Sequence, residues 1–200
     1  LLVHTSFQPG TEYDPISYWR RIPNSDNPYT WVEREEGSWR LRTNASGLRD
    51  DESVTSGSTS DAYRVIALGD SFTLGFSVER SDLFVDLLEG WWNAEGRGVQ
   101  IVNTGTEGYS TDQEVAWLET YGVAWEPELV LLFAYENDLF WNGQTRYAGL
   151  PKPRFEADGS RALGALAAPA PRPWHQRTAL GNLLLKGPDE GVELFQPGDV

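Results

Sequence analysis

The stretch VIALGDSFTLGFSVE (residues 65–79) decides the fold, because it joins an apolar run to a turn of small residues and then to the start of a helix. A short continuous apolar run is typical of a strand buried on both faces. Asp70 and Ser71 follow the run, and both are residue types that cap helix N-termini. Ser71 therefore has two interpretations, as a helix cap and as a nucleophile exposed at a strand-to-helix turn.

Two more apolar runs follow, and segments with helical spacing separate them. VQIVNTG (99–105) and PELVLLFAYEND (127–138) are the expected second and third strands. Apolar strands that alternate with helices predict a parallel sheet covered on both faces. The expected fold class is therefore α/β, a three-layer α/β/α, flavodoxin-like domain. A parallel sheet of only three strands is small, so we expect the domain to be incomplete at its C-terminal end.

Two helices are expected between these strands. In TDQEVAWLETYG we expect Thr111 as the N-cap, Glu114 as its capping-box partner and Gly122 as the stop. In SDLFVDLLEGWWNAEG the expected N-cap is Ser81 or Asp82. The apolar face of this helix is expected to comprise Leu83, Phe84, Leu87, Leu88 and Trp91.

The regions around this core differ from it in composition. Residues 1–49 are rich in aromatic residues and Pro, which predicts extended chain or a hairpin packed on a larger body. Residues 50–62 are acidic and rich in Ser, Thr and Gly with nothing to bury, which predicts a flexible connector. After the third strand, an insertion at about 143–175 is expected to contain a hairpin turning at Asp158–Gly159 and a Pro/Ala-rich loop. The chain is thus divided into an extension with linker, 1–62, and a domain, 63–200.

Composition limits the chemistry that the chain can perform. A chain of 200 residues, 40% of them hydrophobic, suits one domain, and a net charge of −14 disfavours binding to nucleic acid. Cysteine is absent, which excludes thiol nucleophiles, and with only His4 and His175 a multi-histidine zinc site is not expected. We expect neither a metal nor a cofactor. Catalysis then rests on oxygen nucleophiles, carboxylates, amides and backbone groups.

Polar clusters follow all three expected strands. Because ligands bind beyond the carboxyl ends of parallel strands, these clusters are expected to converge at one edge of the sheet. A serine at such a turn has an exposed hydroxyl, and the N–H groups of Ser71 and Gly108 with the side-chain amide of Asn137 are suitable donors to an oxyanion. Asp70 and Asp138 are expected to support these turns rather than to act on a substrate.

At these positions the sequence resembles the SGNH (GDSL) hydrolase family. The matches are Gly69-Asp70-Ser71-Phe72 to the first block of the family, Asn103-Thr104-Gly105-Thr106-Glu107-Gly108 to the second, and Tyr135-Glu136-Asn137-Asp138 to the third. The resemblance implies a serine esterase or lipase-type hydrolase that acts through an acyl-enzyme on Ser71, with Ser71, Gly108 and Asn137 as oxyanion donors. It also implies a small-molecule or glycan ester as substrate and a location outside the cytoplasm or in the cell envelope. Membrane attachment is expected only if an anchor lies upstream of residue 1.

Two features depart from the family pattern. Tyr135 stands where the family has glycine, which leaves Asn137 in place but narrows the approach to it. The fourth block, Asp-x-x-His, has no match, because neither His4 nor His175 has Asp three residues before it. The catalytic His and Asp are therefore unknown, and we expect them beyond Val200, since this block lies near the C-terminus in the family. A substitute base such as His175 is the alternative.

Two other functions stay open beside the esterase. One is an envelope O-acyltransferase of the same fold, which passes the acyl group to a sugar hydroxyl. The other is a catalytically degenerate module that binds acylated glycans without turnover. Asn44-Ala45-Ser46 also matches a glycosylation sequon, although so short a pattern more often has no such role.

Overall fold

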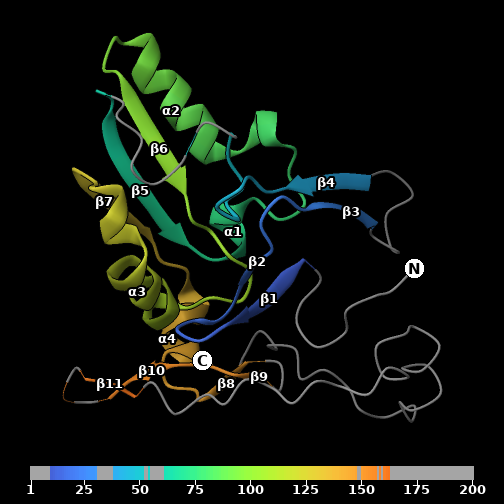
Figure 1. The fold of residues 1–200 in the computed structure, drawn as a ribbon, viewed down its shortest axis with the longest axis vertical. Helices are drawn as coiled ribbons and strands as arrows, with labels where there is room; N and C mark the ends of the chain where they lie inside the picture. Colours follow the sequence, from blue (N-terminus) through green and yellow to red (C-terminus); the bar gives the residue numbers. More distant parts are fainter. Residues whose placement is uncertain are drawn as a thin grey trace.

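A computed structural model of the chain describes residues 10–30, 38–51, 54, 61–147, 150–156, 158 and 160–162. A parallel sheet forms its centre, with helices packed on both faces (Figure 1). The predicted α/β fold class with three layers is therefore confirmed. In the described part of the chain, no helix has the length and hydropathy needed to cross a bilayer.

The three predicted strands form the sheet. The strand β5 (Tyr63–Gly69) lies between β6 (Val99–Asn103) and β7 (Leu129–Phe133), and all three run parallel. Ala67 is paired with Asn103, and Gly69 is paired with Phe133. The register therefore places the carboxyl ends of the three strands at one edge, as the sequence predicted.

The side chains of β5 alternate between two hydrophobic clusters, because successive residues of a strand point to opposite faces. Val65 and Ala67 pack with residues of the helix α2 (Phe84–Ala94). Ile66 and Leu68 lie on the other face, against the helix α3 (Thr111–Thr120) and the 3₁₀ turn η2 (Gly122–Trp125). Burial on both faces explains why the run in β5 is apolar throughout.

The helix α2 begins later than predicted and presents a different face. Ser81 and Asp82 belong to a preceding 3₁₀ turn, η1 (Arg80–Asp82), and the N-cap of α2 is Leu83, whose side chain is buried in the core. The residues that face the sheet are Val85, Leu88 and Trp92, which are three and four positions apart. Three members of the predicted face instead lie on the outside, namely Phe84, Leu87 and Trp91.

The start of α3 also differs from the prediction. Its N-cap is Ser110, Thr111 is the first helical residue, and the side chain of Ser110 makes no capping hydrogen bond. The hydroxyl of Ser110 instead donates to the carboxylate of Asp112 at 2.8 Å. Glu114 forms no capping box, because its side chain is directed into the interior, where it is 2% exposed. The helix ends at Thr120, and Gly122 opens η2 rather than stopping α3.

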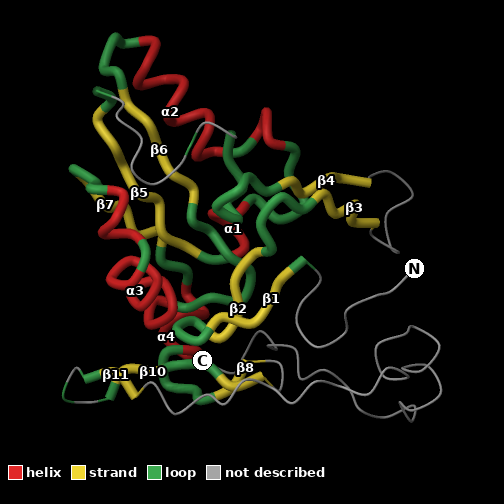
Figure 2. The backbone as a smooth tube through the Cα atoms, in the orientation of Figure 1, coloured by secondary structure: helices red, strands yellow, loops and turns green. Residues whose placement is uncertain are grey.

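The N-terminal extension forms two antiparallel hairpins, as predicted. The first pairs β1 (Thr11–Asp14) with β2 (Tyr18–Arg21), and the second pairs β3 (Asp26–Thr30) with β4 (Ser38–Arg42). The hairpin of β1 and β2 lies beyond the carboxyl ends of β5 and β6 (Figures 1 and 2). The extension therefore lies at the edge of the sheet that the carboxyl ends of the strands form.

The segment after these hairpins contributes to the core. Leu48 and Val54 pack in the cluster that contains Ile66, so the prediction that residues 50–62 bury nothing is wrong at Val54. The Asn44 side chain is buried and donates from Nδ2 to the carbonyl oxygens of Asp51 (3.0 Å) and Val54 (3.1 Å). Because this amide nitrogen is already engaged, Asn44 is not available for glycosylation in this structure.

Short elements follow β7. The helix α4 (Glu136–Trp141) is succeeded by the hairpins β8 (Arg146–Tyr147) with β9 (Leu150–Pro151) and β10 (Arg154–Phe155) with β11 (Arg161–Ala162). The second hairpin confirms the predicted turn at Asp158, whose carboxylate accepts from Ser160 N at 2.9 Å. The first hairpin was not predicted. Residues 163–174, predicted to be a Pro/Ala-rich loop, lie outside the described part of the chain, as does His175.

The packing of Leu48 predicts a large stability effect for a residue of the extension. Leu48 is 6% exposed and Leu87 is 57% exposed. We expect Leu48→Ala to lower the free energy of unfolding by about 2–4 kcal/mol, because it removes buried methyl groups and leaves a cavity. Leu87→Ala is the control, with an expected change within about 0.5 kcal/mol. Urea denaturation followed by tryptophan fluorescence measures both, and equal effects would contradict the described packing.

Candidate active site

The turn after β5 presents Ser71 at the start of a short helix. Asp70 is the N-cap of α1 (Ser71–Leu74), and its carboxylate accepts a hydrogen bond from Phe72 N at 2.9 Å. Ser71 is half-buried, and neither its hydroxyl nor its N–H bonds to another residue of the described chain. The cap is therefore Asp70, and the hydroxyl of Ser71 is left available for another role.

The loop after β6 is joined to this turn by hydrogen bonds. The Asn103 side chain donates from Nδ2 to Thr73 O at 2.9 Å and accepts from Gly105 N at 3.0 Å. Thr106 N donates to Gly69 O at 3.2 Å. These bonds hold the second strand end against the first.

Gly108 follows in the same loop. Its φ of 69° lies in the left-handed region, where glycine is favoured. Its N–H donates to no residue among those that the structure describes. The peptide N–H is therefore available for a ligand.

The third strand end contributes the start of α4. Asp138 accepts a hydrogen bond from Tyr135 N at 3.1 Å and another from the Thr111 hydroxyl at 3.4 Å. Asn137 is half-buried, and in the described structure its amide nitrogen donates to no residue, while its Oδ1 is buried without a partner. Asp138 thus fixes the turn beside Asn137, and the amide of Asn137 is left free.

Tyr135 connects the third strand end to the first. Its ring packs against Phe72, the residue after Ser71, with ring centroids 4.5 Å apart. Both rings are exposed. Tyr135 thus forms an exposed aromatic pair with Phe72 directly beside Ser71.

Arg49, a residue that the sequence did not indicate, supports the turn that carries Ser71 from the extension. Its buried guanidinium donates to the carbonyl oxygens of Leu74 (2.9 Å), Gly75 (2.6 Å) and Val78 (2.6 Å). These carbonyls lie at the end of α1 and just beyond it, where helical hydrogen bonds run out. No pattern in the sequence pointed to Arg49, because its acceptors are backbone atoms.

Buried carboxyl groups surround this edge of the sheet. Desolvation raises the pKa of Asp70 to about 6 and the pKa of Glu114 to about 8, and the charges of neighbouring carboxylates add to both shifts. Desolvation also raises the pKa of Asp138. In the described structure both carboxyl oxygens of Glu114 lack a hydrogen-bond partner. The buried carboxyl group of Glu114 could have been suspected from the run of polar residues at 112–114. The sequence analysis instead assigned Glu114 to a capping box.

No histidine is among the described residues, so the structure does not place a general base. His4 and His175 both lie outside the described part of the chain. Among the residues described, no group of three or more Asp, Glu or His side chains is arranged to hold a metal ion.

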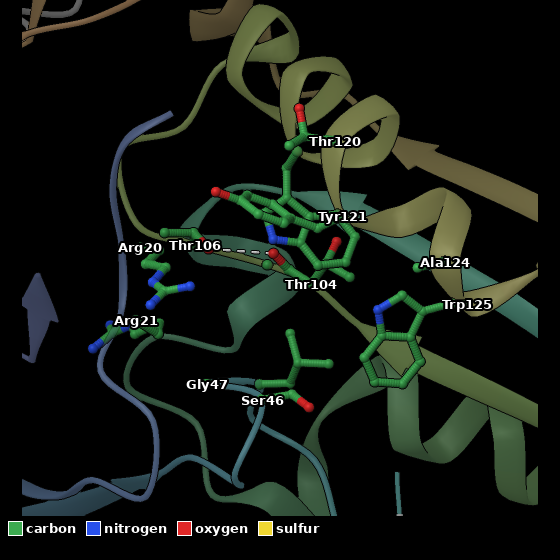
Figure 3. Close-up of a pocket in the computed structure, with 13 residues that line it drawn as sticks. Arg20, Arg21, Ser46, Gly47, Thr104, Thr106, Thr120, Tyr121, Ala124 and Trp125 are labelled. Atoms are coloured by element: carbon green, nitrogen blue, oxygen red, sulfur yellow. Dashed lines mark hydrogen bonds between the residues drawn. The ribbon is translucent and has the colours of Figure 1, made fainter. Parts of the chain in front are cut away.

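A separate cavity of about 250 Å³ lies between the extension and the end of α3 (Figure 3). Arg20 and Arg21 line it from β2, Thr104 and Thr106 from the loop after β6, and Trp125 from η2. Its lining includes none of the three predicted site residues. The loop that carries Gly108 therefore has the extension as a neighbour on this side.

Comparisons with known proteins give partial matches in structure alone. No protein-family model and no curated protein sequence matches this chain. Among solved structures, AlinE4, an SGNH-hydrolase family esterase, is similar to 42% of this chain with 24% identity and a TM-score of 0.37. Two variants of AlinE4 match with 21% and 22% identity and TM-scores of 0.38, over 44% of this chain. The matched part spans about half of each esterase, 45–48% of its length.

The close contact at Gly105 predicts that this position does not tolerate a side chain. A Cβ at Gly105 would lie 2.2 Å from Leu74 N, whereas a Cβ at Gly90, in α2, would meet nothing within 4 Å. We expect Gly105→Ala to destabilise the protein by about 1–3 kcal/mol, because the loop and α1 must separate. Gly90→Ala is the matched control and is expected to stabilise by up to about 1 kcal/mol. A Gly105→Ala protein as stable as the parent in urea denaturation would refute the contact.

The buried carboxyl of Glu114 predicts a stability effect that depends on pH. Folding raises the pKa of Glu114 from 4.5 to about 8, so the folded protein binds a proton at this carboxyl more tightly than the unfolded chain does. This tighter binding stabilises the folded protein fully below about pH 4.5, and the stabilisation is lost as pH rises towards 8. Glu114→Gln removes this titration, so its stability relative to the parent is expected to increase by about 2 kcal/mol or more between pH 5 and pH 8. Urea denaturation at both pH values measures the change.

The exposed Glu119 on the same helix provides the control, Glu119→Gln, for which no comparable change is expected. If Glu114→Gln has the same relative stability at pH 5 and pH 8, the described environment of Glu114 is wrong.

Proposed function

We propose that the protein is a serine esterase that hydrolyses its substrate through an acyl-enzyme on Ser71. The observation that carries the proposal is the set of unused groups at the ends of the three parallel strands. The Ser71 hydroxyl makes no hydrogen bond within the described chain, and the N–H groups of Ser71 and Gly108 and the Asn137 amide nitrogen have no acceptor there. Polar groups at a site built for catalysis are left free when the substrate is their partner.

The reaction follows from these groups. Ser71 Oγ attacks the ester carbonyl carbon, its proton passes to a general base, and the carbonyl oxygen becomes an oxyanion. The N–H groups of Ser71 and Gly108 and the amide of Asn137 donate to that oxyanion, each worth about 3–4 kcal/mol at the transition state. The alcohol leaves with a proton from the conjugate acid of the base, and water then attacks the acyl-enzyme to release the acid and regenerate Ser71.

The base in this proposal is a histidine outside the described residues. Asp70 and Asp138 do not replace it in this proposal, because they already accept backbone hydrogen bonds that hold their turns. The same carboxyl groups, with a net charge of −14 for the chain, favour an uncharged ester over an anionic one.

The decisive prediction concerns Ser71→Ala in the protein with its complete natural sequence. We expect the parent to hydrolyse a short-chain nitrophenyl ester and to be labelled by a serine-reactive phosphonate, and we expect Ser71→Ala to abolish both. The control is Ser77→Ala, which changes a serine of the following loop. Turnover that survives Ser71→Ala would refute the proposal.

The same assay on residues 1–200 locates the base. If the base is a histidine outside residues 1–200, these residues alone are expected to be nearly inactive. Ser71-dependent turnover by residues 1–200 would overturn that expectation, and loss of it in His175→Ala would identify His175 as the base. Adding a glycan acceptor and analysing the products separates hydrolysis from acyl transfer.

A further inference from the structure

The extension contacts the peptide unit that carries one of the three oxyanion donors. Trp19, in β2, is fully buried with 0% of its surface exposed, and its indole N–H donates to the carbonyl oxygen of Glu107 at 2.9 Å. The peptide bond that contains this carbonyl also contains the N–H of Gly108. The indole of Trp19 therefore acts on the same planar group as the proposed donor.

Because the peptide bond is planar, this contact fixes the orientation of the Gly108 N–H. The C=O and N–H of a trans peptide are coplanar and point in opposite directions, so an anchored Glu107 carbonyl fixes where the Gly108 N–H points. A hydrogen bond to the carbonyl also polarises the peptide and strengthens its N–H as a donor. One hydrogen bond thus sets both the direction and the strength of the donor.

Glycine makes such an anchor necessary. Gly108 has a φ of 69°, and without a Cβ it adopts positive and negative φ with similar ease. The peptide before a glycine can therefore rotate between two turn conformations at little cost. The Trp19 contact selects one of them.

Further contacts attach both neighbours of Gly108 to the same strand. The buried side chains of Glu107 and Arg21 form an ion pair. The hydroxyl of Tyr109 is bonded to Ser17 Oγ at 2.7 Å and to Trp19 O at 2.5 Å. Residues 107 and 109 are thus held by residues 17–21, and Arg21 lies beside the same loop in Figure 3.

We propose that Trp19 is a positioning residue, whose indole N–H holds the Glu107–Gly108 peptide so that the Gly108 N–H faces the oxyanion. The inference rests on the proposed esterase function. In this proposal the N-terminal extension is a working part of the active site, because Trp19 acts on it through the Glu107–Gly108 peptide.

The test compares two variants that each remove one hydrogen-bond donor between the extension and the domain. Trp19→Phe removes the donor to Glu107 O, and Tyr121→Phe removes a hydroxyl that donates to Asp14 Oδ2 at 2.7 Å, away from the Glu107–Gly108 peptide. We expect Trp19→Phe to lower kcat about 10- to 100-fold with KM within about 3-fold, because a misdirected donor is lost only in the transition state. Tyr121→Phe is expected to keep kcat within about 3-fold. Equal losses of kcat would show a merely structural role and would overturn the proposal.

A second measurement does not depend on turnover. In protein labelled with ¹⁵N-glycine, the Gly108 amide signal, assigned through Gly108→Ala, is expected to shift or broaden in Trp19→Phe and to stay in place in Tyr121→Phe. An unchanged signal in Trp19→Phe would overturn the anchoring of the peptide. If the Gly108 signal responds as expected but the parent shows no Ser71-dependent turnover, the proposed function fails, and the catalytic role of Trp19 fails with it.

A shape-preserving replacement covers the case in which Trp19→Phe does not fold. Site-specific incorporation of benzothienylalanine at position 19 exchanges the indole N–H for sulfur and keeps the bicyclic ring. We expect the same loss of kcat and the same change at Gly108 as for Trp19→Phe. Retained kcat in this variant would overturn the proposal.

Discussion

The buried side chain of Asn103 is the interaction on which the candidate site depends. It donates to Thr73 O in the turn after Ser71 and accepts from Gly105 N in its own loop, so one amide joins two strand ends. A backbone group left without a hydrogen bond at this buried position would destabilise the folded state by about 1–3 kcal/mol. Both hydrogen bonds of Asn103 are therefore strongly favoured in the folded protein. The hydrogen bond from Asn103 to Thr73 O also holds the loop after β6 so close to α1 that only glycine fits at position 105. The positions of Ser71 and Gly108 follow from this contact.

The N-terminal extension supports both of these strand ends. Arg49 binds three carbonyl oxygens at the end of α1 and just beyond it, and Trp19 binds the carbonyl before Gly108. Leu48 and Val54 add apolar surface to the core on the face of the sheet that α3 covers. Folding of the domain and order at the carboxyl edge of its sheet are therefore coupled to the extension. The composition of the extension alone did not indicate this coupling.

The sequence was sufficient for the features that depend on local pattern. The three strands, the two helices between them and the convergence of their polar ends follow from apolar runs and from the rule for parallel sheets. The boundaries of α2 and α3 were wrong because Leu83 and Ser110 act as N-caps without any side-chain capping bond, which leaves no cap signature to read. Arg49 and Trp19 were missed for a related reason. Both bind backbone carbonyls far away in the sequence, and a carbonyl carries no residue-type signal.

The central claim is that the N–H groups of Ser71 and Gly108 and the amide of Asn137 converge on one oxyanion. A crystal structure of the protein with a phosphonate covalently bound to Ser71 tests it most directly, because the phosphonyl oxygen occupies the place of the oxyanion. The account predicts that this oxygen lies about 2.7–3.1 Å from Ser71 N, Gly108 N and Asn137 Nδ2. A phosphonyl oxygen directed into solvent, or a Gly108 N–H turned away from it while the indole of Trp19 still binds Glu107 O, would contradict the account.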